Sequence, residues 1–247
     1  MKDYGLIGYP LTHSFSKKFW NEKFEKEQSE SHYENYEIET IEKFPDIIKN
    51  NPNLVGMNVT IPYKEQIIPY LDELDDAAQE VGAVNTIKIS RGKKGISLIG
   101  YNSDIYGFES TLKPLLETYH SKALILGTGG ASKAIKYVLK KLGIEFISAS
   151  IEELHENEIR YEEVSSEMLQ ERLLIINATP LGTYPMVDTY PRIPYEFITP
   201  QHVMFDLVYN PEVTRFMDFG REKGATVKNG YDMLIGQALR SYEIWNA

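Results

Sequence analysis

Short apolar runs alternate with helix-like stretches along the N-terminal part of the chain. Tyr4 to Gly8 form an apolar run that ends at Gly8 and Pro10, which predicts a strand entering a loop. Residues 16–28 predict a helix, because aromatic side chains recur four positions apart and form one apolar stripe. A shorter helix is predicted over residues 41–49. Strands are predicted at residues 33–38, 54–61, 83–89 and 96–99, the last two joined into a hairpin by the polar turn 90–95.

The same alternation is clearer in the second half of the chain. Residues 122–126 predict a strand, a glycine cluster follows at once, and residues 131–142 predict a helix that ends at Gly143. Further strands are predicted at 144–148, 173–176 and 203–208, and a last helix at 231–245. Strands that alternate with helices imply a mostly parallel sheet covered by helices on both faces. We therefore expect an α/β fold with two lobes, and an active site in the cleft between them.

The glycine cluster 127–130 has the form of a dinucleotide-binding turn. Gly127 permits a tight turn after the strand, and Gly129 lets the backbone approach a pyrophosphate without an intervening Cβ. The helix that follows presents N–H groups and a partial positive charge to the phosphates. The fingerprint is incomplete, because Ser132 stands at the position of its third glycine. A tight turn without a ligand is the alternative interpretation, but the position between an apolar strand and a helix favours dinucleotide binding.

The residues about 20 positions after Gly127 leave the choice of cofactor open. An acidic residue there favours the ribose 2′-hydroxyl of NAD, and an arginine favours the 2′-phosphate of NADP. The chain instead has Ser148 and Ser150, whose hydroxyls could donate to a phosphate, followed by Glu152 and Glu153, which would repel it. The residues alone therefore favour neither cofactor.

Serines and a lysine stand at the ends of predicted elements in the N-terminal lobe. Ser14 and Ser16, close to the start of a helix, could donate their hydroxyls to an anion, and helix capping is the alternative role. Asn58 and Thr60 share one face of a strand, because side chains alternate with a period of two. Lys64 follows at the exit of that strand, where solvent exposure is the usual state of a single lysine.

Three more polar residues join this group. Asn85, Asn102 and Asp104 lie in or at the ends of predicted strands, although Asn and Asp are poor strand formers. Asp104 by itself would be interpreted as a helix cap. Taken together, these residues fit a polyhydroxylated ligand better than a core, and Lys64 and Asp104 could exchange a proton with it.

The composition narrows the class of protein. Hydrophobic residues make up 42% and charged residues 25%, as in folded proteins, and 26 Lys and Arg against 36 Asp and Glu give a formal charge of −10. This acidic balance argues against nucleic acid as the main partner, because phosphate binding rests on Lys and Arg. The lack of cysteine excludes disulfides and cysteine-ligated metal sites, and it fits a reducing compartment. We find neither a signal peptide nor an apolar stretch of membrane-spanning length, and expect a soluble, cytoplasmic protein.

Taken in order along the chain, these motifs resemble those of the shikimate dehydrogenase family, from Gly5 to the last helix. The matching segments are Gly8-Tyr9-Pro10 with Ser14 and Ser16, Asn58 to Lys64, Gly82 to Thr86, Asn102 to Asp104, Gly127 to Ala131, Asn177 to Gly182, Asp206 to Pro211, and Asn229 to Gln237. Any one of these motifs is weak evidence, whereas all of them in this order are specific.

The resemblance implies reversible reduction of 3-dehydroshikimate to shikimate by NADPH, in the biosynthesis of chorismate and the aromatic amino acids. Lys64 and Asp104 would be the catalytic pair. The implied substrate-binding residues are Ser14, Ser16, Thr60, Asn85, Tyr209 and Gln237. The implied cofactor-binding residues are Gly127, Thr128, Gly129, Gly130, Ala131, Leu207 and Gly230. No metal is required for this chemistry.

The resemblance also implies how the chain is divided. Residues 1–104 would form the substrate-binding lobe and residues 105–230 a Rossmann-type dinucleotide-binding lobe, with the C-terminal helix 231–247 packed back on the first lobe. The polar stretch 117–121 is a second candidate for the separation of the lobes. We expect a monomer or homodimer that acts on a small molecule, with no nucleic-acid or membrane partner.

Three positions depart from the pattern of the family. Ala149-Ser150-Ile151 stand where the family usually has an Asn-Arg-Thr-type motif, so the arginine expected on the 2′-phosphate of NADP is missing. Lys17 replaces a frequent proline, and Thr183 replaces a frequent methionine. The alternative functions are an NAD-using quinate/shikimate dehydrogenase and a non-catalytic protein that binds shikimate as a sensor.

Overall fold

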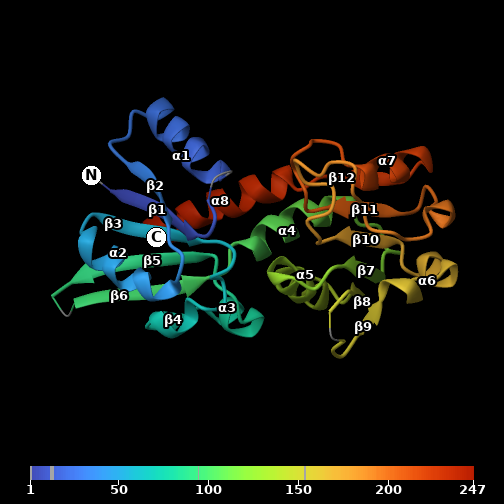
Figure 1. Ribbon diagram of the computed structural model, residues 1–247, viewed down its shortest axis with the longest axis horizontal. Helices are drawn as coiled ribbons and strands as arrows, with labels where there is room; N and C mark the ends of the chain where they lie inside the picture. Colours follow the sequence, from blue (N-terminus) through green and yellow to red (C-terminus); the bar gives the residue numbers. More distant parts are fainter. Residues whose placement is uncertain (1, 12–13, 94, 153) are drawn as a thin grey trace. The chain divides into compact units, whose positions relative to one another are not determined.

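The computed structural model describes residues 2–11, 14–93, 95–152 and 154–247. The chain forms two compact units, one of residues 1–103 and 238–247 and the other of residues 104–237 (Figure 1). The polar stretch 117–121 does not separate them, because it lies inside the second unit. Its backbone closes a turn, in which the His120 N–H donates to the Glu117 carbonyl at 3.0 Å.

A mixed sheet forms the centre of the first unit. Its strands are β1 (Asp3–Gly8), β2 (His32–Glu37), β3 (Leu54–Val59), β4 (Glu73–Leu74), β5 (Thr86–Gly92) and β6 (Gly95–Tyr101), in the order β2-β1-β3-β5-β6-β4. β1 runs parallel to β2 and β3, and β5 runs antiparallel to β3 and β6. The predicted hairpin is present, but its strands continue through Ser90 and Arg91, which pair with Ser97 and Ile96. A polar sequence was wrongly assigned to the turn, because an exposed hairpin accepts polar side chains within its strands.

Helices cover both faces of this first sheet. The helices are α1 (Phe15–Lys26), α2 (Phe44–Asn50) and α3 (Asp76–Val81), with the short 3₁₀ turns η1 (Ile41–Lys43) and η2 (Ile68–Tyr70). On one face, Trp20 and Phe24 of α1 pack in an aromatic cluster with Tyr33 and with Trp245 of the last helix, α8 (Tyr231–Asn246). The other face is covered by α2 (Figure 1), whose Phe44 belongs to the second hydrophobic cluster of the unit.

The second unit is built on a fully parallel sheet. Its strands are β7 (Lys122–Leu126), β8 (Glu145–Ser150), β9 (Glu158–Arg160), β10 (Leu174–Asn177), β11 (Val203–Asp206) and β12 (Thr226–Lys228), in the order β12-β11-β10-β7-β8-β9. This is the doubly wound strand order of dinucleotide-binding sheets, which reverses between β7 and β10. Such sheets bind ligands at the carboxyl ends of the strands beside that reversal.

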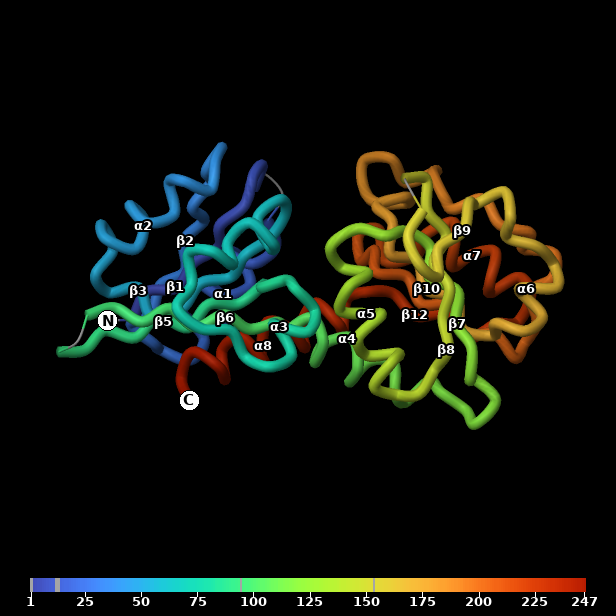
Figure 2. The backbone as a smooth tube through the Cα atoms, turned by 90° about the horizontal axis from the view of Figure 1, so that it is seen from below, coloured from blue at the N-terminus to red at the C-terminus, as the bar shows by residue number. Residues whose placement is uncertain are grey.

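Helices also cover both faces of the second sheet. The helices are α4 (Asp104–Leu112), α5 (Gly130–Lys141), α6 (Ser166–Glu171) and α7 (Arg215–Glu222), with the 3₁₀ turns η3 (Lys113–Leu115), η4 (Tyr161–Glu163) and η5 (Tyr195–Phe197). Leu169 of α6 and Phe216 of α7 share one hydrophobic cluster with the sheet residue Met204. Phe205, the next residue of β11, contacts Phe108 of α4 with ring centroids 5.2 Å apart. Figure 2 shows the strands lying between α5 and the pair α6 and α7. The short elements β4, β9, β12, α3, α6 and α7 were not predicted, because each is too short to show a clear hydrophobic period.

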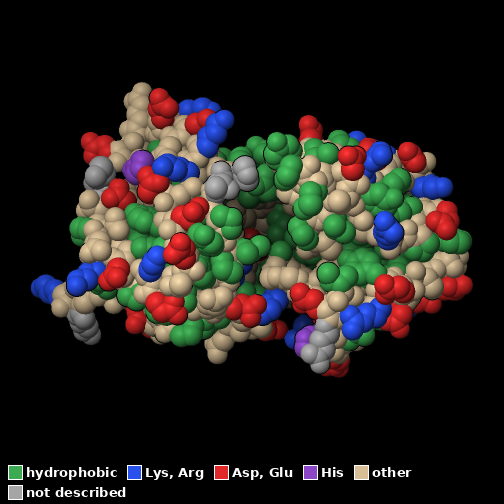
Figure 3. All heavy atoms as spheres, in the orientation of Figure 1, with side chains coloured by type: hydrophobic (Ala, Val, Ile, Leu, Met, Phe, Trp, Pro, Cys, Tyr) green, Lys and Arg blue, Asp and Glu red, His purple; other side chains and the backbone are tan. Residues whose placement is uncertain are grey.

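Acidic and basic side chains are interspersed on the face shown in Figure 3. Some form ion pairs within one helix, such as Lys18 with Glu22 of α1 at 3.9 Å and Arg240 with Glu243 of α8 at 2.8 Å. In the part of the chain that the structure describes, no helix has both the length and the apolar character needed to cross a membrane. The same residues include no group of three His, Asp or Glu side chains suited to hold a metal ion.

Candidate active site

The predicted glycine turn forms at the carboxyl end of β7. Gly127 has a φ of +99°, a backbone conformation that glycine adopts without strain, and its N–H donates to the Ala149 carbonyl at 2.9 Å. A Cβ at Gly127 would lie 2.8 Å from the side chain of Thr179. This position therefore requires glycine both for its conformation and for its close approach to the segment after β10.

The following residues leave space for a ligand at the start of α5. Gly129 is the N-cap of α5 and Gly130 its first residue, and a Cβ on either would meet nothing within 4 Å. The hydroxyl of Ser132, in place of the third glycine, donates to the Gly129 carbonyl at 2.7 Å. The first turn of α5, all of which is described, contains no acidic side chain. Its N–H groups and partial positive charge can therefore face a phosphate.

A pocket of about 740 Å³ lies beside this turn, within the second unit. Its lining residues are Gly127, Thr128 and Gly129 of the turn, Ile151 and Glu152 after β8, Tyr161 and Glu162 of η4, residues 178–181 after β10, and residues 188–192. The volume is within the range of small-molecule sites. Gly130 and Ala131, the other predicted turn residues, follow as the first residues of α5.

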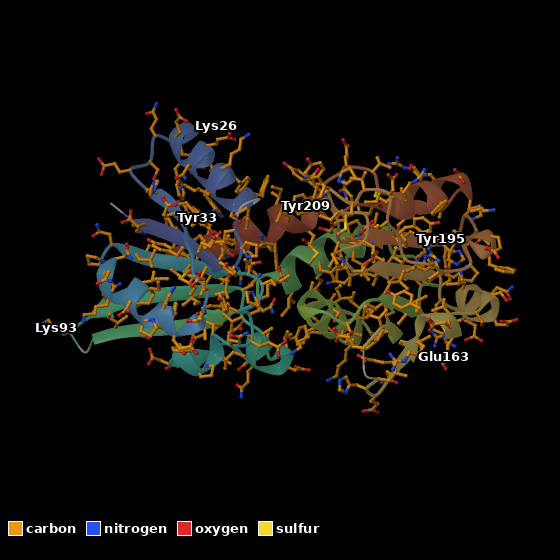
Figure 4. The ribbon with its side chains drawn as sticks, in the orientation of Figure 1. Lys26, Tyr33, Lys93, Glu163, Tyr195 and Tyr209 are labelled. Atoms are coloured by element: carbon orange, nitrogen blue, oxygen red, sulfur yellow. The ribbon has the colours of Figure 1, made fainter. Side chains whose placement is uncertain are left out.

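Leu207 and Gly230, both predicted to contact the cofactor, lie next to one another. The Gly230 N–H donates to the carbonyl of Val208 at 3.1 Å, and a Cβ on Gly230 would lie 2.1 Å from the Leu207 carbonyl oxygen. Only glycine allows the start of α8 to approach the end of β11 so closely. Tyr209 follows on the same segment (labelled in Figure 4), and burial raises the pKa of its phenol, which therefore stays protonated at neutral pH.

Asp104 and Gln237 are held by two helices that touch at a glycine. Asp104 is the first residue of α4 and is 9% exposed. One turn later, a Cβ on Gly107 would lie 2.5 Å from the Met233 carbonyl and 2.9 Å from the backbone nitrogen of Gln237. The side chain of Gln237 donates to the Leu234 carbonyl at 3.0 Å. The second unit thus contains both Asp104 and Gln237.

Ser14 and Ser16 have different surroundings in the first unit. Ser14 is the N-cap residue of α1, but its side chain makes no capping hydrogen bond. Its Oγ is buried and has no partner among the described residues, which exclude Thr12 and His13 of the same loop. The side chain of Ser16 forms a hydrogen bond with the Tyr33 hydroxyl. The capping interpretation is therefore wrong for Ser14, whose buried hydroxyl is suited to bind a ligand.

Thr60 and Lys64 lie just beyond β3. The Thr60 N–H donates to the Ile7 carbonyl at 2.9 Å, and its methyl group occupies the space that a Cβ on Gly8 would need. The Lys64 carbonyl accepts from the Val84 N–H at 2.7 Å. These backbone bonds bring Lys64 and Thr60 to the same end of the sheet as the residue after Val84, Asn85.

The side-chain amide of Asn85 is held in place by hydrogen bonds to its oxygen atom. Asn85 is 3% exposed, and its Oδ1 accepts from the Ser103 N–H at 2.7 Å and from the hydroxyls of Thr86 and Ser103 at 3.1 Å. Its Nδ2 donates to no group among the described residues. The orientation of the amide is thus set from one side, and its two N–H donors can serve a ligand hydroxyl.

A buried polar chain lies behind these positions, and its members were not recognised as a unit from the sequence. The Tyr33 hydroxyl donates to Asn58 Oδ1 at 2.8 Å, and Asn58 Nδ2 donates to the Ser241 hydroxyl of α8 at 3.0 Å. The Ser241 hydroxyl is 3.0 Å from that of Ser103. Tyr33 (labelled in Figure 4) is fully buried, and burial raises its pKa, so its phenol remains a donor. The side chain of Asn58 therefore makes hydrogen bonds in the interior of the unit.

Comparison with known proteins identifies the family. Residues 6–87 match the model of the shikimate dehydrogenase substrate binding domain. Over 98% of its length the chain is 34% identical to the shikimate dehydrogenase (NADP(+)) of Desulforamulus reducens, of which it covers 88%. Over 99% of its length it is 38% identical to the enzyme of the same name from Clostridium beijerinckii, of which it covers 92%. The chain belongs to the shikimate dehydrogenase family.

The fold agrees with this membership of the shikimate dehydrogenase family. The crystal structure of shikimate 5-dehydrogenase from Listeria monocytogenes, in complex with shikimate and NAD, superposes with a TM-score of 0.88 at 28% identity, covering all of this chain and 92% of that one. The predicted family is confirmed, and so is the α/β class with an N-terminal substrate lobe and a Rossmann-type lobe. The roles assigned to individual residues, including the pairing of Lys64 with Asp104, stay predictions.

One of the departures from the shikimate dehydrogenase pattern has a local explanation. Lys17 forms an ion pair with Glu34 at 2.5 Å, so its charge is compensated within the first unit. The Thr183 N–H closes a turn on the Pro180 carbonyl at 3.1 Å, but nothing in the structure explains its threonine side chain. The suggestion that Ser148 and Ser150 donate to a phosphate is wrong, because their side chains are buried in β8, with exposed fractions of 0% and 1%.

The second unit nevertheless fits a dinucleotide. The open glycine positions at the start of α5 allow close approach of a pyrophosphate, and the adjacent pocket holds one unsatisfied donor. This donor is the hydroxyl of Tyr161, which is buried and has no partner among the described residues. Tyr161 was not predicted, because its Tyr-Glu-Glu sequence carries no motif. The polar chain through Tyr33 and Ser241 was also not found, since it joins segments far apart in the sequence.

Proposed function

We propose that this protein catalyses the reversible reduction of 3-dehydroshikimate to shikimate by NADPH, in the biosynthesis of chorismate and the aromatic amino acids. The observation that carries the proposal is an identity of 34% and 38%, across both units, to enzymes named shikimate dehydrogenase (NADP(+)). The glycine turn and pocket of the second unit support the use of a nicotinamide dinucleotide.

The carboxylate of the substrate binds at the start of α1 in this proposal. Ser14 has a buried hydroxyl without a partner among the described residues, and Ser16 lies two residues further along. A carboxylate is acceptor-only, so it satisfies the donor that the Ser14 hydroxyl offers. The Ser16 hydroxyl has one proton and is hydrogen-bonded to the Tyr33 oxygen, so it must turn from Tyr33 to donate to the substrate.

Neutral polar side chains bind the ring hydroxyls of the substrate. Asn85 presents its oriented amide N–H groups, and Thr60 its hydroxyl, from the end of the first sheet. Tyr209 and Gln237 add a phenol and an amide from the second unit. Such groups select a polyhydroxylated ring, because a ligand without the hydroxyls would leave them unpaired.

Lys64 acts as the general acid of the reduction and the general base of the reverse reaction. The nicotinamide ring supplies the hydride when the cofactor is bound. As the hydride reaches the carbonyl carbon, the electron pair of the C=O bond moves to its oxygen, and the Lys64 ammonium stabilises and protonates that oxygen. In this proposal the Asp104 carboxylate lies beside Lys64 and accepts a hydrogen bond from its ammonium, which keeps another N–H directed at the substrate oxygen.

The backbone N–H groups of the glycine turn and the start of α5 hold the pyrophosphate in this proposal. Thr128 shares a hydrogen bond with Ser150 at 3.1 Å, which fixes the turn against β8. Leu207 and Gly230 bound the space for the nicotinamide half through the close contact of their backbones. The protein is further proposed to act in the cytoplasm as a monomer or homodimer, which its lack of cysteine suits.

The test is dehydrogenation of shikimate by the purified full-length protein, with NADP and NAD offered separately, followed by the absorbance of the reduced nicotinamide. Turnover with NADP supports the proposal, and turnover with NAD alone supports the NAD-using quinate/shikimate dehydrogenase instead. A folded protein that turns over shikimate with neither cofactor refutes it. Calorimetric binding of shikimate without turnover would instead support the sensor function.

A further inference from the structure

The connection after β8 is unusually short for a parallel sheet. β9 pairs directly with β8, and only residues 151–157 join them, without a helix in the part that the structure describes. Neighbouring parallel strands usually need a dozen or more residues, most often including a helix. The residues that directly follow β8 therefore reach the pocket themselves. Ile151 and Glu152 line it, and Ile151 is 84% exposed.

The polar groups at the end of β8 are already engaged. The Ser150 hydroxyl is hydrogen-bonded to Thr128 and accepts from the Glu152 N–H at 3.0 Å. The guanidinium of Arg160, on the neighbouring strand β9, donates to the Glu152 carbonyl and does not line the pocket. Neither Ser150 nor Arg160 is among the described residues that line the pocket, although dinucleotides place the adenosine ribose at this strand end.

The charges that line the pocket are mostly negative. Glu152, Glu162 and Asp188 contribute three carboxylates, and Arg192 is the one cationic side chain among the described lining residues. Asp188 is partly compensated, since it lies 3.9 Å from Arg215. A 2′-phosphate adds further negative charge to this environment, whereas a ribose hydroxyl adds none.

Tyr161 supplies a group that matches a neutral ribose or base. Its hydroxyl is buried and has no partner among the described residues, and its side chain lines the same pocket as Glu152 and Ile151. Burial raises the pKa of Tyr161 to about 12, so the phenol keeps its proton at neutral pH. A protonated phenol can donate to a ribose oxygen or a ring nitrogen, but it carries no charge to balance a phosphate.

We infer that this pocket receives the adenosine half of the dinucleotide with a free 2′-hydroxyl, so that the protein binds NAD at least as tightly as NADP. Glu152 accepts a hydrogen bond from the ribose hydroxyls, Tyr161 donates one, and Ile151 gives an apolar contact to the base. This inference rests on the proposed function, because it takes the pocket to be the dinucleotide site.

The experiment is calorimetric titration of the full-length protein with NAD and with NADP at low ionic strength, where charge effects are least screened. We expect the Kd for NAD to be equal to or lower than the Kd for NADP. A lower Kd for NADP overturns the inference and leaves the proposed function intact. Binding of neither dinucleotide overturns both.

Variants of the same pocket test the cause. Ile151→Arg places a cation directly after β8 and is expected to tighten NADP binding about tenfold while NAD changes less than about threefold. Glu152→Gln is expected to raise the Kd for NAD and to lower the Kd for NADP. The control is Ile96→Arg, the same change at an exposed isoleucine of the hairpin in the first unit, which should alter neither Kd. An Ile151→Arg variant with an unchanged NADP affinity contradicts the placement of the ribose beside β8.

Discussion

Asp206, the last residue of β11, carries a carboxyl group that should titrate far from its usual range. Its side chain accepts hydrogen bonds from Thr214 Oγ1 at 2.5 Å, Asn177 Nδ2 at 2.9 Å and the Val208 N–H at 3.0 Å. The residue is 0% exposed, and burial raises the pKa of the carboxyl to about 6 in spite of these donors. Asp206→Asn keeps the shape and the two contacts of Oδ1, and it removes the ionisation.

The size of the effect follows from the pKa. A rise from 3.8 to about 6 corresponds to about 3 kcal/mol, at 1.36 kcal/mol for each pKa unit. The folded protein holds this proton more tightly than the unfolded chain does. Asp206 therefore contributes its full stabilisation below the unfolded pKa of 3.8, and the contribution is lost as the pH rises through 6. The free energy of unfolding of the Asp206→Asn variant should therefore rise relative to that of the wild type as the pH increases from 3.8 to 6.

The measurement is urea unfolding of both proteins, followed by circular dichroism between pH 4 and pH 7.5, with hydrogen exchange of β10 and β11 to locate the change. The free energy of unfolding of Asp206→Asn minus that of the wild type should rise by about 2.5 kcal/mol across this range, because part of the effect lies below pH 4. Asp188→Asn, at a 91% exposed carboxyl of the same unit, is the control for the same substitution on the surface. A difference that stays constant within about 0.5 kcal/mol for Asp206→Asn would refute the reasoning.

Four further substitutions test the site. Lys64→Ala should lower kcat about 10²-fold or more in steady-state assays, as loss of a general acid does, and a value within about threefold of wild type removes it from the chemistry. Ser14→Ala should raise the KM for shikimate more than it lowers kcat, and an unchanged KM speaks against carboxylate binding. Tyr33→Phe should raise the same KM and cost about 1–3 kcal/mol in urea unfolding, whereas Tyr4→Phe, whose hydroxyl bonds Asn246 outside the polar chain, should leave the KM unchanged. Gly230→Ala should weaken dinucleotide binding in calorimetry, because its Cβ would lie 2.1 Å from a backbone carbonyl of the β11 segment; unchanged affinity contradicts this.

Local sequence patterns were sufficient to predict those elements whose own residues carry a clear strand, turn or helix pattern. The strand 122–126 and the turn at Gly127 lie as predicted, and the helix begins at Gly130, because glycine, an apolar run and helical composition act within a few residues of one another. The hairpin was found, but its ends were misplaced, because polarity marks exposure rather than the end of a strand. The helices α6 and α7 were missed, because they are short and owe their stability to packing on the sheet.

The sequence by itself determined the α/β class, the dinucleotide turn and the set of polar residues from which the family follows. Only the tertiary structure decided what each polar side chain does. It placed Asn58 in a buried hydrogen-bonded chain with Tyr33 and Ser241. It left the hydroxyl of Ser14 without a partner among the described residues, and it buried the side chains of Ser148 and Ser150 on β8. The physical reason is that a hydrogen bond depends on atoms brought together by folding. The type of a residue and its neighbours in the sequence limit which hydrogen bonds it can make. Which of these bonds form depends on the distant segments that fold against it.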